Sequence, residues 1–153
     1  MQTTMIVFVI VTALVLAAIR IGGGLYECLL VDRVWPGTPA LIQPERGGIN
    51  RKLFWMPVHL AFELTLMIAI WLAWSEDVIR TWLLVAAASH VLMRGWSAAY
   101  FIPRAIEFER AGDWTPDLRA RATTWVRLSV WRLPLDLVTL FAVWAAVIAA
   151  VSS

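Results

Sequence analysis

The chain has 153 residues, of which 61% are hydrophobic and only 16% are charged, and its mean hydropathy is +0.74. Because soluble domains are usually about 45–50% apolar, this composition indicates an integral membrane protein of one domain over residues 1–153, without room for a separate soluble catalytic domain. The net charge is only +2 and the basic residues cluster in two loops, which favours membrane topology over nucleic-acid binding.

Four apolar runs divide the chain, and each has the roughly 20 residues that a helix needs to cross a hydrocarbon core about 30 Å thick. Only helices and closed barrels satisfy their backbone hydrogen bonds in lipid, and these runs lack the alternation of barrel strands. The sequence therefore predicts an all-α integral membrane four-helix bundle. Its spans are expected at residues 5–30, 53–74, 81–102 and 133–151.

The three connections between the spans differ in length and composition. The first is long and rich in proline, whereas the second, residues 75–80, is short enough to make the two spans beside it an antiparallel hairpin. In the third, the helix is expected to run past Pro103 to about Ala111. Thr115 and Pro116 then have the pattern of an N-cap and first helical residue. They predict an additional amphipathic helix over 116–132, lying at the membrane interface before the fourth span.

The positive charges predict the orientation in the membrane. Ten of the 13 lysines and arginines fall in the first and third connections: Arg33, Arg46, Arg51, Lys52, Arg104, Arg110, Arg119, Arg121, Arg127 and Arg132. Only Arg80 lies in the second connection. The positive-inside rule places residues 31–52 and 103–132 in the cytoplasm and both termini outside, in what we expect to be a bacterial inner membrane.

Five ionisable residues fall deep inside the predicted spans: Arg20, His59, Glu63, His90 and Arg94. A charge at the centre of a bilayer costs about 2.5–3.5 kcal/mol on insertion scales, so such residues face the bundle interior and usually serve a site. Counted along the helices, all five lie at similar depth in one half of the bilayer. The i,i+4 spacing puts His59 with Glu63 on one helix face and His90 with Arg94 on another. We therefore expect an intramembrane pocket.

A structural role for these charges is the alternative. Two ion pairs, Glu63 with Arg94 and Glu27 with Arg20, would neutralise most of them. The glycines at 22–24 are likewise open to two interpretations, because they could form one wall of a cavity or allow tight packing through Ala18-xxx-Gly22.

Three chemistries fit the pocket. General acid–base catalysis would use His59, Glu63, His90 and Arg94, the arginine stabilising a developing oxyanion. A metal would use His59, Glu63 and His90, the donor types of a 2-His-1-carboxylate site, although the spacing matches no metal motif. Haem held between the two histidines is disfavoured because residue counting separates them by about 9 Å in depth. The expected substrate-binding residues are Arg20, Gly23, Tyr26, Glu27, Trp96 and Tyr100.

Three segments carry a family resemblance: GGGLYE at 22–27, INRKLFWMPVH at 49–59, and HVLMRGWSAAYFIPRAIEFERA at 90–111. Together with four spans in about 150 residues, they resemble the anthrone-oxygenase-like family of small membrane proteins, most of which have no assigned activity. The resemblance implies a four-helix membrane bundle. In the fungal members with an assigned role, it implies oxidation of an anthrone to an anthraquinone without a tightly bound cofactor. His59 and His90 would be the candidate bases and Arg94 the phenolate or enolate partner.

The sequence thus favours an intramembrane enzyme that acts on a lipophilic, aromatic small molecule by oxidation or proton transfer, with no bound cofactor and with iron or haem less favoured. A non-catalytic membrane subunit or ligand-binding module is the alternative, and a haem- or metal-binding redox protein is a further one. The expected partners are membrane lipid and the lipophilic substrate, not nucleic acid. Outer faces rich in Ala and Leu would also permit a homo-oligomer.

Overall fold

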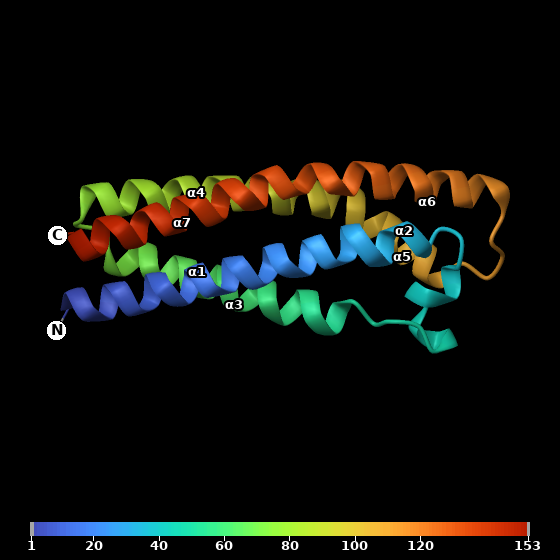
Figure 1. Ribbon diagram of the computed structural model, residues 1–153, viewed down its shortest axis with the longest axis horizontal. Coiled ribbons are helices and arrows are strands. Elements are labelled where there is room, and N and C mark those ends of the chain that lie inside the picture. Colours follow the sequence, from blue (N-terminus) through green and yellow to red (C-terminus); the bar gives the residue numbers. More distant parts are fainter. Residues whose placement is uncertain (1, 153) are drawn as a thin grey trace.

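Four long helical rods lie side by side in the computed structural model, which describes residues 2–152 (Figure 1). The described part contains helices, turns and loops but no strand, so the predicted all-α fold class is confirmed. The first rod begins and the last rod ends at the same end of the molecule, together with the short connection between the second and third rods.

Three of the rods are built from more than one helical segment. In chain order the main helices are α1 (Gln2–Tyr26) with α2 (Asp32–Val34), α3 (Lys52–Leu72), α4 (Asp77–Trp96) with α5 (Ile102–Arg110), and α6 (Pro116–Ser129) with α7 (Leu133–Ser152). Two π-helical turns, Glu27–Val31 and Ser97–Phe101, join α1 to α2 and α4 to α5. As predicted, the third rod continues past Pro103, and it ends at Arg110.

Three continuous helices are long and apolar enough to cross a membrane: Thr3–Val34, Lys52–Leu72 and Pro116–Ser152. The span expected at 81–102 is not among them. It coincides mostly with α4, in which Ser89, His90 and Arg94 lower the hydropathy of an otherwise apolar helix. The same helix carries His90 and Arg94, two of the polar side chains described below.

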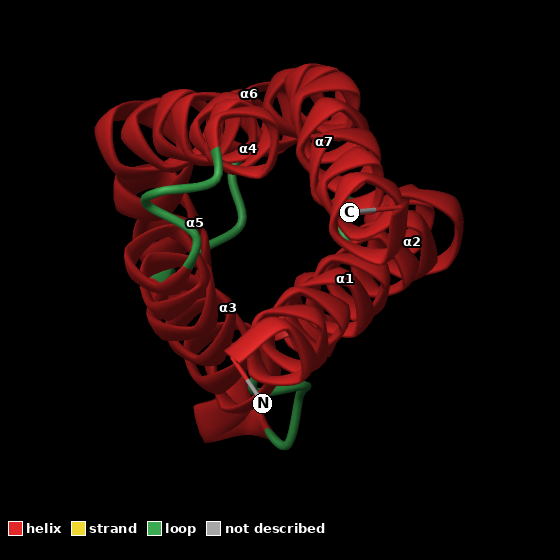
Figure 2. Cartoon of the chain, turned by 90° about the vertical axis from the view of Figure 1, so that its left-hand side faces the viewer, coloured by secondary structure: helices red, strands yellow, loops and turns green. Residues whose placement is uncertain are grey.

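The rods form a ring when viewed along their length (Figure 2). α7 packs extensively against α1 and α4, and α1 packs against α3, whereas α3 and α4 contact each other only sparsely. The ring is therefore closed, and its loosest seam lies between α3 and α4.

The start of α6 follows the predicted cap. Thr115 has an extended backbone, its hydroxyl accepts a hydrogen bond from the backbone N–H of Leu118 at 3.2 Å, and Pro116 is the first helical residue. Figure 1 shows α6 continuing along the axis of α7 through the short 3₁₀ turn Val130–Arg132. The interfacial position of this segment stays a prediction.

Each rod turns a stripe of small or branched apolar residues inward at helical spacing, as on α1 at Ile6, Ile10, Ala13 and Ala17. These stripes form a first core at the end where the chain begins and ends. A second, aromatic core lies at the other end: Val31, Trp35, Ile42, Phe101, Phe108, Leu118, Ala122 and Trp125. The polar residues of the spans lie between the two cores.

Much of the outer surface of α1, α3, α4 and α7 is apolar. Phe8, Trp71 and Phe141 are each more than half exposed, and many other large apolar side chains share this exposure. A continuous apolar exterior of this kind is unfavourable in water and suits a hydrocarbon environment.

The glycines of α1 differ in their surroundings. Gly22 and Ala18 lie on the exposed side, and a Cβ on Gly22 would meet nothing within 4 Å, so Ala18-xxx-Gly22 makes no tight packing within this chain. A Cβ on Gly23 would lie 2.5 Å from Phe54 Cε1 and 3.3 Å from Trp55 Cη2, which shows close approach of α3 at this residue.

We expect Gly22→Ala to stabilise the protein by up to about 1 kcal/mol, because alanine favours helix over glycine by that amount and the new methyl group meets nothing. Gly23→Ala should lose this gain or destabilise the fold, because Phe54 must move. The comparison is a thermal unfolding midpoint for both variants in the same detergent. Equal midpoints for the two variants would contradict the close approach at Gly23.

Candidate intramembrane site

The inward stripes become polar halfway along the rods. On α1 the stripe of Ala13 and Ala17 continues to Arg20, which is 2% exposed, and on α4 the stripe of Ala86 continues to His90, which is 4% exposed. Because these residues keep the helical spacing of the apolar stripe, the fold directs them into the interior rather than toward lipid.

Arg20 and Asp136 form an ion pair that joins α1 to α7, with Arg20 Nη2 donating to Asp136 Oδ1. The guanidinium also lies over the Phe62 ring, 4.6 Å from its centroid. The expectation that Arg20 pairs with Glu27 was wrong. Glu27 lies nearly two turns further along the helix, about 10 Å away, where it accepts a hydrogen bond from Trp55 Nε1 at 2.9 Å.

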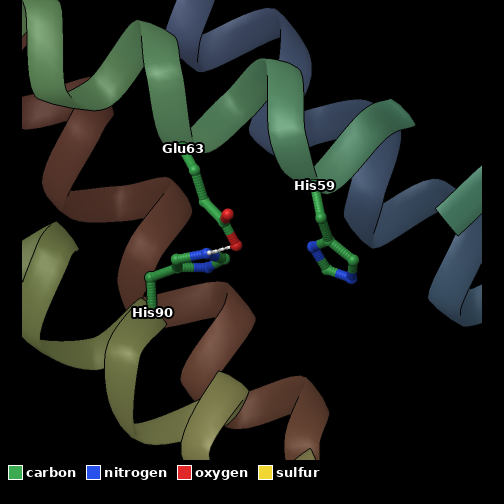
Figure 3. A group of neighbouring side chains, drawn as sticks. All are labelled: His59, Glu63 and His90. Carbon is green, nitrogen blue, oxygen red and sulfur yellow. Dashed lines mark hydrogen bonds and ion pairs between the residues drawn. The ribbon is translucent and has the colours of Figure 1, made fainter. Parts of the chain in front are cut away.

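His59, Glu63, His90 and Arg94 meet between α3 and α4, as the sequence predicts. Glu63 Oε1 lies 3.1 Å from His90 Nε2 and 3.0 Å from Arg94 Nε, so the carboxylate is shared by an imidazole and a guanidinium. Figure 3 shows His59 one helical turn from Glu63 on α3, with one ring nitrogen on the side of the Glu63–His90 contact. The predicted Glu63–Arg94 ion pair is therefore present.

Both histidines are held by aromatic neighbours. The His59 ring stacks on Trp55 at 5.5 Å between centroids, and the His90 ring meets the edge of Phe62 at 5.0 Å. The Nδ1 atoms of His59 and His90 are buried without a hydrogen-bond partner among residues 2–152. Their ring centroids are 6.0 Å apart, so the separation of about 9 Å expected from residue counting was too large. The residue count assumed that the predicted spans end at the same depth. The rod of α4 and α5 instead continues to Arg110, beyond the predicted end of that span at residue 102.

A cavity of about 400 Å³ lies on the side of this cluster toward the second core. Residues from all four rods line it, including Glu27, His59, Arg94, Trp125 and Arg132. The volume falls within the range of small-molecule pockets, which is about 300–1,000 Å³. Mostly apolar walls with a few converging charged groups suit a lipophilic molecule that carries a polar end.

The expected substrate-binding residues divide into two groups. Glu27 lines the cavity, and Gly23 lies against the aromatic side chains Phe54 and Trp55 of α3. Arg20 does not line the cavity itself but pairs with Asp136, which does. The remaining three do not line it. Tyr26 is 58% exposed and Trp96 is 36% exposed, whereas Tyr100 is half-buried beneath the guanidinium of Arg104, which lies 4.0 Å from its ring centroid.

Arg132 is the most prominent lining residue that sequence reasoning missed. Its guanidinium lies 4.2 Å from the Phe101 centroid and 5.8 Å from the Trp125 centroid, and Nη1 lies 3.4 Å from Ser97 Oγ. Among the described residues no carboxylate lies within ion-pair distance of it. The signal was its position just before the fourth span, four residues from Asp136 on the same helix face.

Both π-helical turns border the cavity. Glu27 and Cys28 belong to the first turn, Ser97 and Phe101 to the second, and all four line the cavity. Such wide turns are rare and occur frequently at functional sites. Here the two turns widen the first and third rods beside the cavity.

The arrangement can perform proton transfer next to a lipophilic ligand. His59 lines the cavity, and His90 behind it is oriented by Glu63. Arg94 and Arg132 line the same cavity and could stabilise a developing negative charge on oxygen. His59, Glu63 and His90 also form the one group of three or more His, Cys, Asp or Glu in residues 2–152 with the arrangement of metal ligands, because their ligand atoms lie within 4.8 Å of one another.

Comparison with family models, with curated proteins and with solved structures finds no match for this chain.

Breaking the Arg20–Asp136 pair should strongly destabilise the protein. Arg20→Met leaves the mostly buried Asp136 carboxylate without its cation; for fully buried pairs this loss typically costs about 3–5 kcal/mol, which is the upper limit here. The double variant Arg20→Met with Asp136→Leu should recover much of this loss, because both charges are then removed. The measurement is unfolding in mixed detergent micelles.

The matched control is Arg80→Gln. Arg80 pairs with Asp77 at 2.7 Å, but the Asp77 side chain is 85% exposed, so the change should cost at most about 1 kcal/mol. A double variant less stable than Arg20→Met alone would contradict the assignment of this pair.

Proposed function

We propose that this protein is an integral membrane enzyme that acts on a lipophilic, aromatic small molecule by proton-transfer or oxidation chemistry. The observation that carries the proposal is the position of His59. Its ring lies in the wall of the cavity, and the Glu63–His90 contact lies directly behind it. A polar group of this kind is costly to enclose among apolar rods, which favours a functional reason for its presence.

The proposed topology is a four-span bundle in a bacterial inner membrane, with α4 as the third span in chain order. The last rod is about 55 Å long, whereas the hydrocarbon core is about 30 Å thick. The α6 part must therefore reach the interface or beyond, and its exposed arginines Arg119, Arg121 and Arg127 support this. The cationic connections at this end favour a cytoplasmic position, with both termini outside.

His59 is the proposed general base. It stands next to the ligand space, and Trp55 fixes its ring by stacking at 5.5 Å. His90, oriented by Glu63, would exchange protons with it, and Arg94 and Arg132 would stabilise the enolate or phenolate oxygen of the substrate. The aromatic walls at Trp55, Phe101 and Trp125 would hold a planar ring system.

The family resemblance suggests the reaction. A methylene carbon of an anthrone loses a proton to the base, and the carbanion bonds to dioxygen. The peroxide oxygen takes up that proton, and loss of water then leaves the quinone carbonyl. One anthrone and one dioxygen thus give one anthraquinone and one water. No cofactor is required by this balance.

The activity test uses the purified full chain in lipid nanodiscs with an anthrone and dissolved dioxygen, followed by quinone absorbance. We expect turnover above the rate in empty nanodiscs. His59→Ala, His90→Ala and Arg94→Gln should each lower the rate by about a hundredfold or more, the range typical of general acid–base groups. Arg80→Gln, at the far end of the rods, is the control and should keep the full rate.

Full activity in all three site variants would refute the site assignment. The rival is a non-catalytic subunit whose charges are structural. In that case the double variant Glu63→Gln with Arg94→Gln should be more stable than either single variant, and no turnover should be found.

A reporter fused after Ser153 tests the orientation. We expect a periplasmic alkaline phosphatase fusion to be active and the matched cytoplasmic fluorescent protein fusion to be dark. Moving the fusion into the loop at residues 47–50 should reverse both signals. A fluorescent C-terminal fusion would overturn the proposed topology.

A further inference from the structure

We propose that His59, Glu63 and His90 form a binding site for one divalent first-row transition-metal ion. The proposal concerns binding alone. It does not depend on the enzymatic function proposed above, which requires no metal.

The donor atoms are already grouped. One ligand atom from each of the three residues lies within 4.8 Å of the others. Two ligands of one metal with bonds of about 2.1 Å are roughly 3 Å apart, and His90 Nε2 and Glu63 Oε1 are separated by 3.1 Å. A shift of the His59 ring by about 1–2 Å would complete the set. The ring could slide along the Trp55 face, because the cavity rather than packed side chains borders its other side.

An unpartnered nitrogen atom of His59 points to a missing ligand. His59 Nδ1 is buried and has no hydrogen-bond partner among residues 2–152. Figure 3 shows one ring nitrogen of His59 facing the side on which Glu63 and His90 meet. A buried polar atom left without a partner typically costs about 1–3 kcal/mol, so a metal bond to His59 would remove an existing cost.

The donor set indicates the class of metal. Two imidazoles and one carboxylate are typical ligands of Zn²⁺ and Fe²⁺, whereas Mg²⁺ and Ca²⁺ prefer oxygen ligands. Three protein ligands leave further coordination positions open. Because His59 also lines the cavity, these positions would be accessible from the ligand space.

The nearby arginine side chains affect how tightly the metal ion would bind. Arg20 is neutralised by Asp136, but Arg94 Nε lies 3.0 Å from the same Glu63 oxygen that faces His90. A dication and Arg94 would therefore compete for Glu63. The side chain of Arg94 is 38% exposed, so it can withdraw toward the cavity when a metal binds. Removing the arginine should strengthen metal binding, an effect opposite to that of removing a ligand.

The experiment uses the full chain with a histidine-free affinity tag, stripped with a chelator and placed in nanodiscs. Co²⁺ is titrated while its visible d–d absorption is recorded, and Zn²⁺ is then added in competition. We expect saturation at one Co²⁺ per chain and displacement by Zn²⁺. His59→Ala and Glu63→Gln should weaken binding by about tenfold or more, Arg94→Gln should strengthen it severalfold, and Glu107→Gln, at an exposed ion pair with Arg121 elsewhere, should leave it unchanged.

Circular dichroism and gel filtration establish that each variant is folded, and His90→Gln provides a milder second ligand variant because its amide can still bond to Glu63. The proposal is overturned if the wild-type chain shows no saturable Co²⁺ absorption. It is equally overturned if His59→Ala with His90→Gln retains the wild-type affinity. Anthrone turnover is measured separately on the chelator-stripped protein. Turnover there supports the enzymatic proposal whatever the Co²⁺ titration shows, because that activity survives only if no metal is needed.

Discussion

Four of the charges between the two apolar cores neutralise one another in two ion pairs, and the relative depth of the four rods follows from these pairs. An unpaired charge among apolar side chains is strongly destabilising, whereas a pair that keeps its hydrogen bond is tolerated. Arg20 and Asp136 come from the first and last rods, and Glu63 and Arg94 from the middle two. Each pair therefore fixes the depth of one rod against another, which apolar stripes of similar residues would leave free to slide.

The two cores differ in a way that positions the cavity. The first is built from small and branched side chains, notably alanine on every rod, so the rods approach closely there. The second is built around Trp35, Phe108 and Trp125, whose rings meet edge to face or tilted at 5.4–6.4 Å. Bulky rings keep the rods apart at this end, and the two π-helical turns lie at the transition. Charged and aromatic side chains both line the space that results.

Much of the fold could be predicted from the sequence, because long apolar runs in a short chain leave few alternatives to helical rods. The site was partly predictable: His59, Glu63, His90 and Arg94 share a helix spacing, and their pairing followed from complementary charge. The partner of Arg20 could not be predicted, because Glu27 and Asp136 are equally acidic and only the relative depth of α7 selects between them. Arg132 was interpreted as a charge of the interfacial helix over 116–132. In the structure α6 runs on into α7 without a change of direction, and the only local sign of this continuity was the four-residue spacing from Arg132 to Asp136.

The π-helical turns have a consequence for the length of the chain. A single residue inserted in an α-helix rotates everything after it by about 100° and would turn an inward stripe toward lipid. A wide turn absorbs one extra residue locally, so the inward stripes before and after segments 27–31 and 97–101 do not have to follow one unbroken helical repeat. Chains one residue shorter in segments 27–31 or 97–101 could therefore keep both cores intact while losing the widened wall. Such deletions would separate, within one molecule, what holds the rods together from what makes room between them.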